Sequence, residues 1–371
     1  MSPRVVHIIN NLVVGGAERF LVLLADAQRR LGLDVEVCAL VEPNPLAPQL
    51  AARSIPFTRL GRQRLNDPRL VPDLVRHIRA RRPDILHTHL FYADTAGRIA
   101  GRLAGVRAIV STEHSTEGAP LSARRRLAMR GTAGLAQRVV AVSEPVRRAA
   151  AARLGIDVER IEVIPNGIEI APWEDATPLG ASELGVEPGT ILVGSVGRLD
   201  EAKGYDVLIE SIARLADPRL RLLLVGDGPR RAALAALVAD RGLAEKVRFL
   251  GWRDDVPRVL ATLDVFVLPS RWEGHSMALL EAMASGRPCV VSDIPELTDV
   301  LGDACERARP GDPDALASAL RALVDDAARR ATLAAGARAA ARRFSIEASA
   351  ARYVTVYQQI APRAWNEPGP R

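Results

Sequence analysis

Short apolar runs alternate with amphipathic stretches along most of the chain, and this alternation restricts the possible folds more than any other feature. A parallel connection between two strands needs a crossover of a dozen or more residues, usually a helix, so the pattern predicts parallel sheets covered by helices. In the first half the expected helices include residues 17–31, 67–82 and 123–134, with a helix start at Asn66-Asp67-Pro68. The expected strands are residues 5–9, 35–40, 85–87, 108–111, 139–142 and 161–164.

The alternation stops between residues 165 and 190, where prolines lie among glycines and acidic residues, which is typical of a linker or hinge. It then restarts, and a last helix is expected over residues 346–360. In this second half the expected helices are residues 205–215, 229–241, 277–285 and 313–326, and the expected strands are residues 191–196, 220–225, 247–250, 265–268 and 289–292.

The chain therefore predicts an α/β fold with two doubly wound, Rossmann-like domains. Residues 1–170, joined by a C-terminal helix at 346–362, form the expected first domain, and residues 186–345 form the second. Ligands of such sheets bind at the carboxyl ends of the strands. We therefore expect a ligand in a cleft between the two domains, which would close about the hinge.

Charge is distributed unevenly between the two halves. Residues 1–170 carry 25 Arg against 16 acidic residues, whereas residues 171–371 carry 25 Lys plus Arg against 28 acidic residues. A basic half suits solvated helix faces, an anionic membrane surface or an anionic acceptor. Aromatic residues are only 4% of the chain, so no nucleic-acid partner is expected. With no signal-like start and no run of eighteen apolar residues, we expect a cytoplasmic protein.

The segment from Glu273 to Gly286 is the most informative one, because it follows an apolar strand and opens a helix. Ser276 is an expected N-cap, which would leave backbone amides free to bind a phosphate at the helix N-terminus. Glu281 and Glu273 would then reach ribose and sugar hydroxyls. The expected phosphate-binding amides are those of Met277, Ala278 and Leu279.

A second loop, residues 197–204, follows another expected strand and carries Arg198 and Lys203, which are suited to a diphosphate. Lysine is rare in this chain: only Lys203 and Lys246 occur, and arginine is otherwise the cation used. A lysine in a glycine-flanked loop therefore indicates a need for a compact charge.

Smaller signals point to the same edges of the sheets. Gly15 and Gly16 follow the first strand and permit close approach to a ligand, but they do not form the dinucleotide fingerprint, so a nicotinamide enzyme is disfavoured. Gly226 follows a strand in the second half, and Trp252 and Arg253 could hold a nucleobase through main-chain groups.

Three histidines, His87, His89 and His114, lie at strand ends in the first half. We expect His114 to be functional. His87 and His89 share a strand face, which is metal-like, but no carboxylate or cysteine cluster completes such a site, so no metal is expected. His7 and His77 are interpreted as structural. Cys38, Cys289 and Cys305 lack metal-ligand spacing and are expected to be free thiols.

Taken together, these segments resemble the retaining, nucleotide-sugar-dependent glycosyltransferases of family 4 (glycosyl transferases group 1), which have the GT-B fold. The resemblance covers residues 4–360. Its most specific parts are the Glu-x7-Glu segment at 273–281, the loop at 197–204, Val-Gly-Asp-Gly-Pro at 225–229 and Val-Ile-Pro-Asn-Gly at 163–167.

The resemblance implies a role for each matching residue. Arg198 and Lys203 would bind the donor diphosphate, Glu281 the ribose and Glu273 the transferred sugar, while His114 would lie near the reacting sugar. Gly15 and Gly16 would approach the donor phosphate or the acceptor. Family members often read Glu-Gly-Phe-Gly where this chain has Glu273, Gly274, His275 and Ser276, a departure that concerns the identity of the donor sugar.

The predicted function is therefore transfer of a sugar from a nucleotide diphosphate sugar to a lipid-linked or anionic acceptor in cell-envelope polysaccharide synthesis. The donor's own phosphate would take the acceptor proton, and neither a cofactor nor an essential metal is expected. Two alternatives stay open: a nucleotide-sugar epimerase, which needs no acceptor, and a non-catalytic sugar-nucleotide-binding subunit.

Overall fold

A computed structural model describes residues 2–116, 122–187 and 189–366. The chain divides into two compact units, the first formed by Met1–Gly167 with Ile346–Arg371 and the second by Ile168–Ser345. Most of the proline-rich stretch therefore belongs to the second unit. Closure about this stretch stays a prediction.

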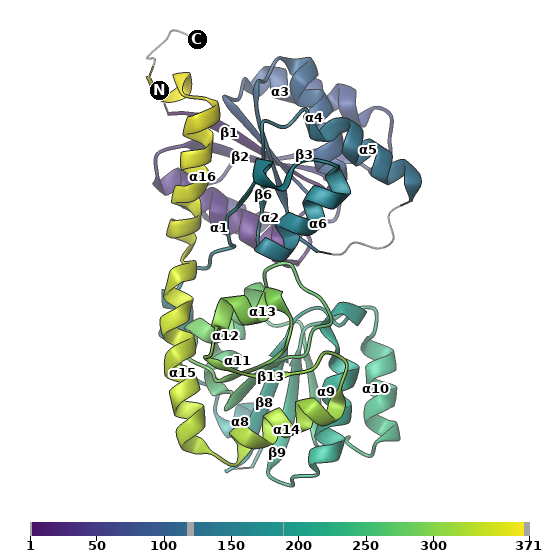
Figure 1. Ribbon diagram of the computed structural model, residues 1–371, viewed down its shortest axis with the longest axis vertical. Coiled ribbons are helices and arrows are strands. Elements are labelled where there is room, and N and C mark those ends of the chain that lie inside the picture. The colour runs from purple at the N-terminus through teal and green to yellow at the C-terminus, as the bar shows by residue number, and fades with distance from the viewer. Residues whose placement is uncertain (1, 117–121, 188, 367–371) are drawn as a thin grey trace. The chain divides into compact units, whose positions relative to one another are not determined.

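The first unit contains a seven-stranded sheet with the order β3-β2-β1-β4-β5-β6-β7, and every pair in it is parallel (Figure 1). Its strands are β1 (Arg4–Ile9), β2 (Asp34–Val41), β3 (Phe57–Arg62), β4 (Ile85–His89), β5 (Ala108–Glu113), β6 (Arg138–Ala141) and β7 (Ile161–Val163).

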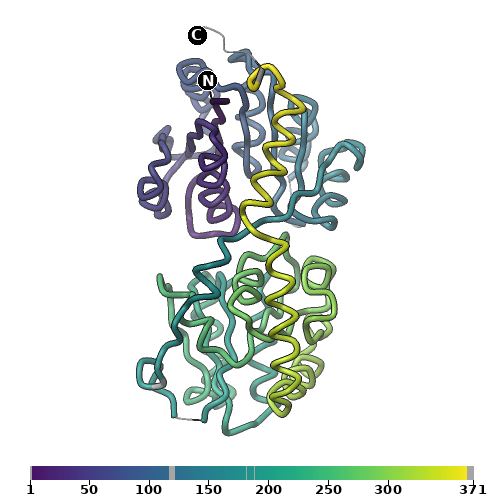
Figure 2. Tube along the Cα trace, turned by 90° about the vertical axis from the view of Figure 1, so that its left-hand side faces the viewer, coloured from purple at the N-terminus to yellow at the C-terminus, as the bar shows by residue number. Residues whose placement is uncertain are grey.

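Helices cover both faces of this sheet. The last long helix of the chain returns to the first unit and packs beside the first one (Figures 1 and 2). The helices are α1 (Gly16–Arg30), α2 (Ala47–Ala52), α3 (Leu70–Arg81), α4 (Phe91–Ala104), α5 (Ala123–Ala133), α6 (Glu144–Leu154), α16 (Ile346–Ile360) and α17 (Arg363–Asn366). The helix expected to start at Asp67 begins three residues later, because Asp67 instead forms a turn in which its carboxylate accepts from the amide of Arg69 at 2.9 Å.

The second unit contains a six-stranded parallel sheet with the order β10-β9-β8-β11-β12-β13. Its strands are β8 (Ile191–Val196), β9 (Leu220–Val225), β10 (Val247–Gly251), β11 (Val265–Leu268), β12 (Cys289–Ser292) and β13 (Cys305–Ala308). Its helices are α7 (Ala171–Glu174), α8 (Ala181–Leu184), α9 (Tyr205–Leu215), α10 (Arg231–Asp240), α11 (Val256–Thr262), α12 (Met277–Ala284), α13 (Pro295–Leu301), α14 (Pro313–Val324) and α15 (Ala327–Ala341).

Two Rossmann-like parallel sheets confirm the predicted fold class. The sequence missed two strands, β3 and β13, and each lies at the edge of its sheet. Central strands such as β11 are buried on both faces and read as continuous apolar runs, whereas β3 alternates between half-buried and exposed residues. These two edge strands therefore lack the apolar signal on which the prediction rested, whereas the opposite edge strands, β7 and β10, were predicted.

One glycine is required for two loops of the second unit to approach each other. Gly204, between β8 and α9, has φ +63°, and a Cβ added there would overlap the carbonyl oxygen of Pro269, which follows β11. The obstacle is backbone, which cannot rotate away as a side chain can.

This geometry predicts that Gly204→Ala destabilises the second unit more than Gly242→Ala. Gly242 has a similar φ of +66° but nothing within 4 Å of an added Cβ. Each variant incurs about 1–2 kcal/mol for the left-handed conformation, and Gly204→Ala adds roughly 1–3 kcal/mol for the overlap. Urea unfolding of the two variants measures the difference, and equal loss of stability would contradict the predicted backbone contact.

Candidate active site

The second sheet brings two loops together at its carboxyl edge. The strand order reverses between β8 and β11, which pair with Val265 opposite Val193. The loop after β8 contacts the loop after β11, since the amide of Arg271 donates to the carbonyl of Ala202 at 2.7 Å. Ligands of open α/β sheets bind at such a reversal of strand order.

Lys203 and Glu273 form an ion pair across these two loops. The Nζ atom of Lys203 lies 2.5 Å from Oε1 of Glu273, and the hydroxyl of Ser270 donates to the same oxygen at 2.7 Å. The two charged side chains are only 19% and 8% exposed. Two residues predicted to contact the donor are thus adjacent. The ammonium of Lys203, here paired with Glu273, is a compact positive charge of the kind that suits phosphate oxygens.

The N-terminus of α12 lies next to this pair in the chain, and one part of its prediction needs correction. Ser276 caps the helix as expected, but its hydroxyl accepts from the amide of Leu279 at 3.4 Å. Leu279 therefore does not offer a free amide to a phosphate. Within the described residues, the amides of Met277 and Ala278 remain available for an anion, because first-turn amides have no partner inside the helix. Glu281, one turn further on, is fully buried.

Gly274 and His275 lie in the turn between Glu273 and the helix cap. The imidazole of His275 is buried, and its ring centroid lies 5.3 Å from that of Phe344. Burial lowers the pKa of His275 to about 4, so the ring is neutral at pH 7.

The other residues predicted to bind the nucleotide-sugar donor lie in the loops that follow β8, β9 and β10. The side chain of Arg198 is 67% exposed, with its Nε atom 3.9 Å from Asp200. Gly226 brings the loop after β9 against the loop after β8, because an added Cβ would overlap the carbonyl of Gly197. Trp252 is 55% exposed, and Arg253 makes a two-pronged contact with Asp255 at 2.7 and 2.6 Å. The guanidinium of Arg253 is thus engaged by a carboxylate.

In the first unit, Gly15 and Gly16 begin α1 directly after the loop that follows β1. A Cβ on Gly15 would overlap the carboxylate of Glu18, which therefore lies against the start of the helix. A carboxylate there complements the helix dipole and repels a phosphate. Whether these glycines approach the donor phosphate or the acceptor stays a prediction.

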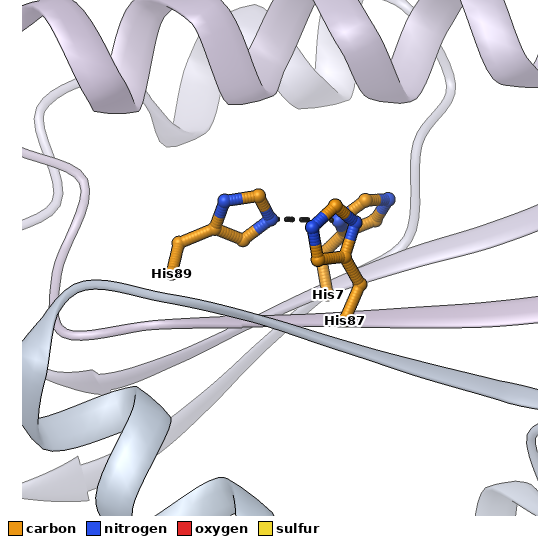
Figure 3. Close-up of side chains that lie close together, drawn as sticks. All are labelled: His7, His87 and His89. Carbon is orange, nitrogen blue, oxygen red and sulfur yellow. Dashed lines mark hydrogen bonds between the residues drawn. The ribbon is translucent and has the colours of Figure 1, made fainter. Parts of the chain in front are cut away.

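Histidines from three neighbouring strands meet on the α1 and α16 side of the first sheet. Figure 3 shows His7 of β1 with His87 and His89 of β4. Nδ1 of His7 lies 3.0 Å from Nε2 of His89, and Nδ1 of His89 lies 3.1 Å from Nε2 of His114, directly after β5. His7, expected to be only structural, therefore contacts the predicted site through His89.

One ligand atom from each of His7, His87 and His89 lies within 4.8 Å of the others, a spacing that a metal ion could use. Every ring nitrogen of the three already makes a hydrogen bond. Burial lowers the pKa of His7 to about 4 and the pKa values of His87 and His89 well below their usual range. This arrangement is that of a neutral hydrogen-bonded cluster, and the absence of a metal stays a prediction.

Sequence reasoning missed the residues that complete this cluster. Gln28 of α1 and Tyr357 of α16 contact His7 and His87 at 2.8 and 2.6 Å. Their positions reflect helix packing, for which the sequence offered no signal beyond an amphipathic pattern. In the described part of the chain, no helix is long and apolar enough to cross a membrane.

Comparison with known proteins places these features in a family. Residues 190–326 match the model of glycosyl transferases group 1, and residues 14–171 match that of glycosyltransferase family 4. The phosphatidyl-myo-inositol mannosyltransferase of Mycobacterium leprae is 32% identical, over 94% of this chain and 94% of that protein. A galactosyltransferase of Escherichia coli that acts on α-D-GlcNAc-diphosphoundecaprenol is 31% identical, over 62% of this chain and 63% of that protein.

A solved structure has the same fold over nearly the whole chain. The Anabaena protein HepE in complex with UDP-glucose is 25% identical and superposes with a TM-score of 0.82, covering 98% of this chain and all of that one. The two matched family models, the full-length mannosyltransferase relative and this shared fold agree. The chain belongs to glycosyltransferase family 4, within the glycosyl transferases of group 1.

Proposed function

We propose that this glycosyltransferase moves a sugar from a nucleotide diphosphate sugar to a lipid-linked acceptor with retention of anomeric configuration. The observation that carries the donor half of the proposal is the ion pair of the half-buried Lys203 with the buried Glu273, directly before α12 in the chain. A cation and bare amides suit a diphosphate, and a carboxylate suits sugar hydroxyls. HepE, which binds UDP-glucose, supports the same class of donor.

The proposed reaction needs no protein nucleophile. The acceptor hydroxyl oxygen would attack the anomeric carbon on the face that the diphosphate leaves, while the bond from that carbon to the diphosphate oxygen breaks. The acceptor's proton would pass to an oxygen of the departing phosphate. Lys203, Arg198 and the α12 amides would stabilise the charge that develops on the leaving group, as preorganised dipoles and cations do. The chain would then need no essential metal.

The acceptor proposal rests on the surface of the first unit and on the relatives. α5 carries Arg124 and Arg126 on its exposed surface beside Leu127, whose side chain is 73% exposed. Basic side chains flanking an exposed apolar residue suit an anionic membrane surface. The mannosyltransferase and galactosyltransferase relatives are named for acceptors that carry a lipid. We infer a peripheral role at the cytoplasmic face of a membrane, in cell-envelope polysaccharide synthesis.

The donor proposal predicts selective nucleotide-sugar binding that depends on Lys203. We expect one of UDP-, GDP- or ADP-sugars to bind in calorimetry with EDTA present, and Lys203→Ala to weaken it by roughly tenfold or more through the lost charge-assisted contact. Glu281→Ala should also weaken binding. Lys246→Ala is the control, because Lys246 precedes β10 at the opposite edge of the sheet.

Binding that requires a metal, or equal effects of the two lysine substitutions, would contradict this donor site. An acceptor-independent change of the bound sugar, seen by NMR of the recovered nucleotide sugar, would instead indicate an epimerase.

The acceptor proposal predicts binding to anionic vesicles. The double variant Arg124→Gln, Arg126→Gln should sediment less with phosphatidylglycerol vesicles than the wild type, by roughly tenfold or more at about 1 kcal/mol per arginine. Phosphatidylcholine vesicles should bind neither protein. Arg309→Gln with Arg342→Gln, two exposed arginines of the second unit, is the matched control. Equal sedimentation of the two double variants would count against α5 as the contact surface.

A further inference from the structure

A continuous line of hydrogen bonds runs from His114 into the core of the first unit. Nε2 of His114 contacts His89 at 3.1 Å, His89 contacts His7 at 3.0 Å, and Nε2 of His7 contacts Oε1 of Gln28 at 2.8 Å. The amide nitrogen of Gln28 then donates to the hydroxyl of Tyr357 at 3.0 Å. We call His114, His89, His7 and Gln28 the histidine relay.

The orientation of the Gln28 amide and the direction of the relay go together. A neutral imidazole has one donor and one acceptor nitrogen. Because the amide oxygen of Gln28 accepts, Nε2 of His7 must carry the proton, which leaves its Nδ1 as an acceptor. His89 must then donate from Nε2 and accept at Nδ1. His114 in turn donates from Nε2, and its own Nδ1 is left with a lone pair.

The remaining contacts agree with this direction. Tyr357 accepts from Gln28 and can donate to Nδ1 of His87 at 2.6 Å, and Nε2 of His87 can donate to the hydroxyl of Thr112 at 2.8 Å. Thr112 then donates to the hydroxyl of Tyr353 at 3.1 Å. Each group gives one proton to the next, so no two donors face each other.

The opposite direction fails at the His114 end. It would reverse the Gln28 amide and place a proton on Nδ1 of His114. That atom is buried and has no hydrogen-bond partner among the described residues. A buried N–H without an acceptor is rarer in proteins than an acceptor with an unused lone pair. The free protein should therefore hold the Nε2–H form.

We propose that His89, His7 and Gln28 are positioning residues that hold His114 as its Nε2–H tautomer, so that the Nδ1 lone pair accepts a hydrogen bond from a substrate hydroxyl. This inference rests on the proposed function for the identity of the substrate. Burial lowers the pKa of His114 to about 4, which keeps the ring neutral at pH 7. A neutral acceptor can take a hydrogen bond from a sugar hydroxyl without adding charge to the substrate.

Two substitutions of His89 distinguish the effect of losing its hydrogen bond to His114 from the effect of losing side-chain packing. The side-chain oxygen of an asparagine lies near the position of Nδ1 of histidine, so His89→Asn keeps the acceptor that faces His114. The longer glutamine places its amide near Nε2, so His89→Gln keeps the contact with His7 and loses the one with His114. His77→Gln is the control, because His77 lies on α3 and pairs with Glu36 at 3.2 Å.

The first test is long-range ¹⁵N–¹H NMR of histidine-labelled protein, which distinguishes protonated from bare ring nitrogens among the six histidines. The wild type and His89→Asn should show His114 neutral, protonated at Nε2 and bare at Nδ1. His89→Gln should show a mixture of tautomers. A wild-type His114 protonated at Nδ1, or cationic at pH 7, would overturn the inference whether or not the substitutions fold.

The second test is release of nucleoside diphosphate from the nucleotide sugar that the wild type turns over fastest in a UDP-, GDP- and ADP-sugar panel. His89→Gln should lower kcat by about tenfold, the scale of one transition-state hydrogen bond, with KM within about twofold. His89→Asn should restore most of this loss. Equal kcat for His89→Gln and wild type would overturn the role of the relay. Binding of no nucleotide sugar by the wild type would instead defeat the proposed function and leave the tautomer result standing.

Discussion

Parallel pairing of the strands is the constraint on which every candidate site residue depends. All strands of a parallel sheet end at the same edge, so loops that are remote in sequence meet there. Lys203 and Glu273 are separated by 70 positions and meet because β8 and β11 are neighbours. In the first unit, His7 lies opposite His87 in the β1–β4 pair, which brings His89 within reach. Neither arrangement depends on local sequence around one residue.

The sequence predicted those features that repeat along the chain or stand in strand-to-helix loops. β11 and α12 were recognisable because a fully apolar strand leads into a capped helix, so Glu273, Ser276 and Glu281 could be assigned together. The edge strands β3 and β13 could not, because a strand covered on fewer sides carries polar residues such as Arg59 and Glu306. Sheet position, which decides that burial, is set by tertiary packing.

The candidate site was predicted less completely than the fold, for a related reason. Periodicity tells which face of a helix is buried but not which atom of a buried side chain finds which partner. Gln28 reads as a polar residue late in α1, yet its amide contacts both His7 and Tyr357. Leu279 was expected to offer an amide, and only the geometry of the Ser276 side chain shows that the cap already uses it. Hydrogen-bond assignments of this kind need coordinates.

The histidine cluster gives a physical reason for the chain's last long helix to return to the first unit. Tyr353 and Tyr357 of α16 supply hydroxyls to Thr112, His87 and Gln28, all of them buried. Each of those polar groups left unpaired would cost about 1–3 kcal/mol. Docking of α16 and the hydrogen bonds at His7 are therefore coupled through Gln28, whose amide contacts both His7 and Tyr357. The tautomer proposed for His114, which directly follows β5, thus depends on how α1 and α16 pack against the sheet.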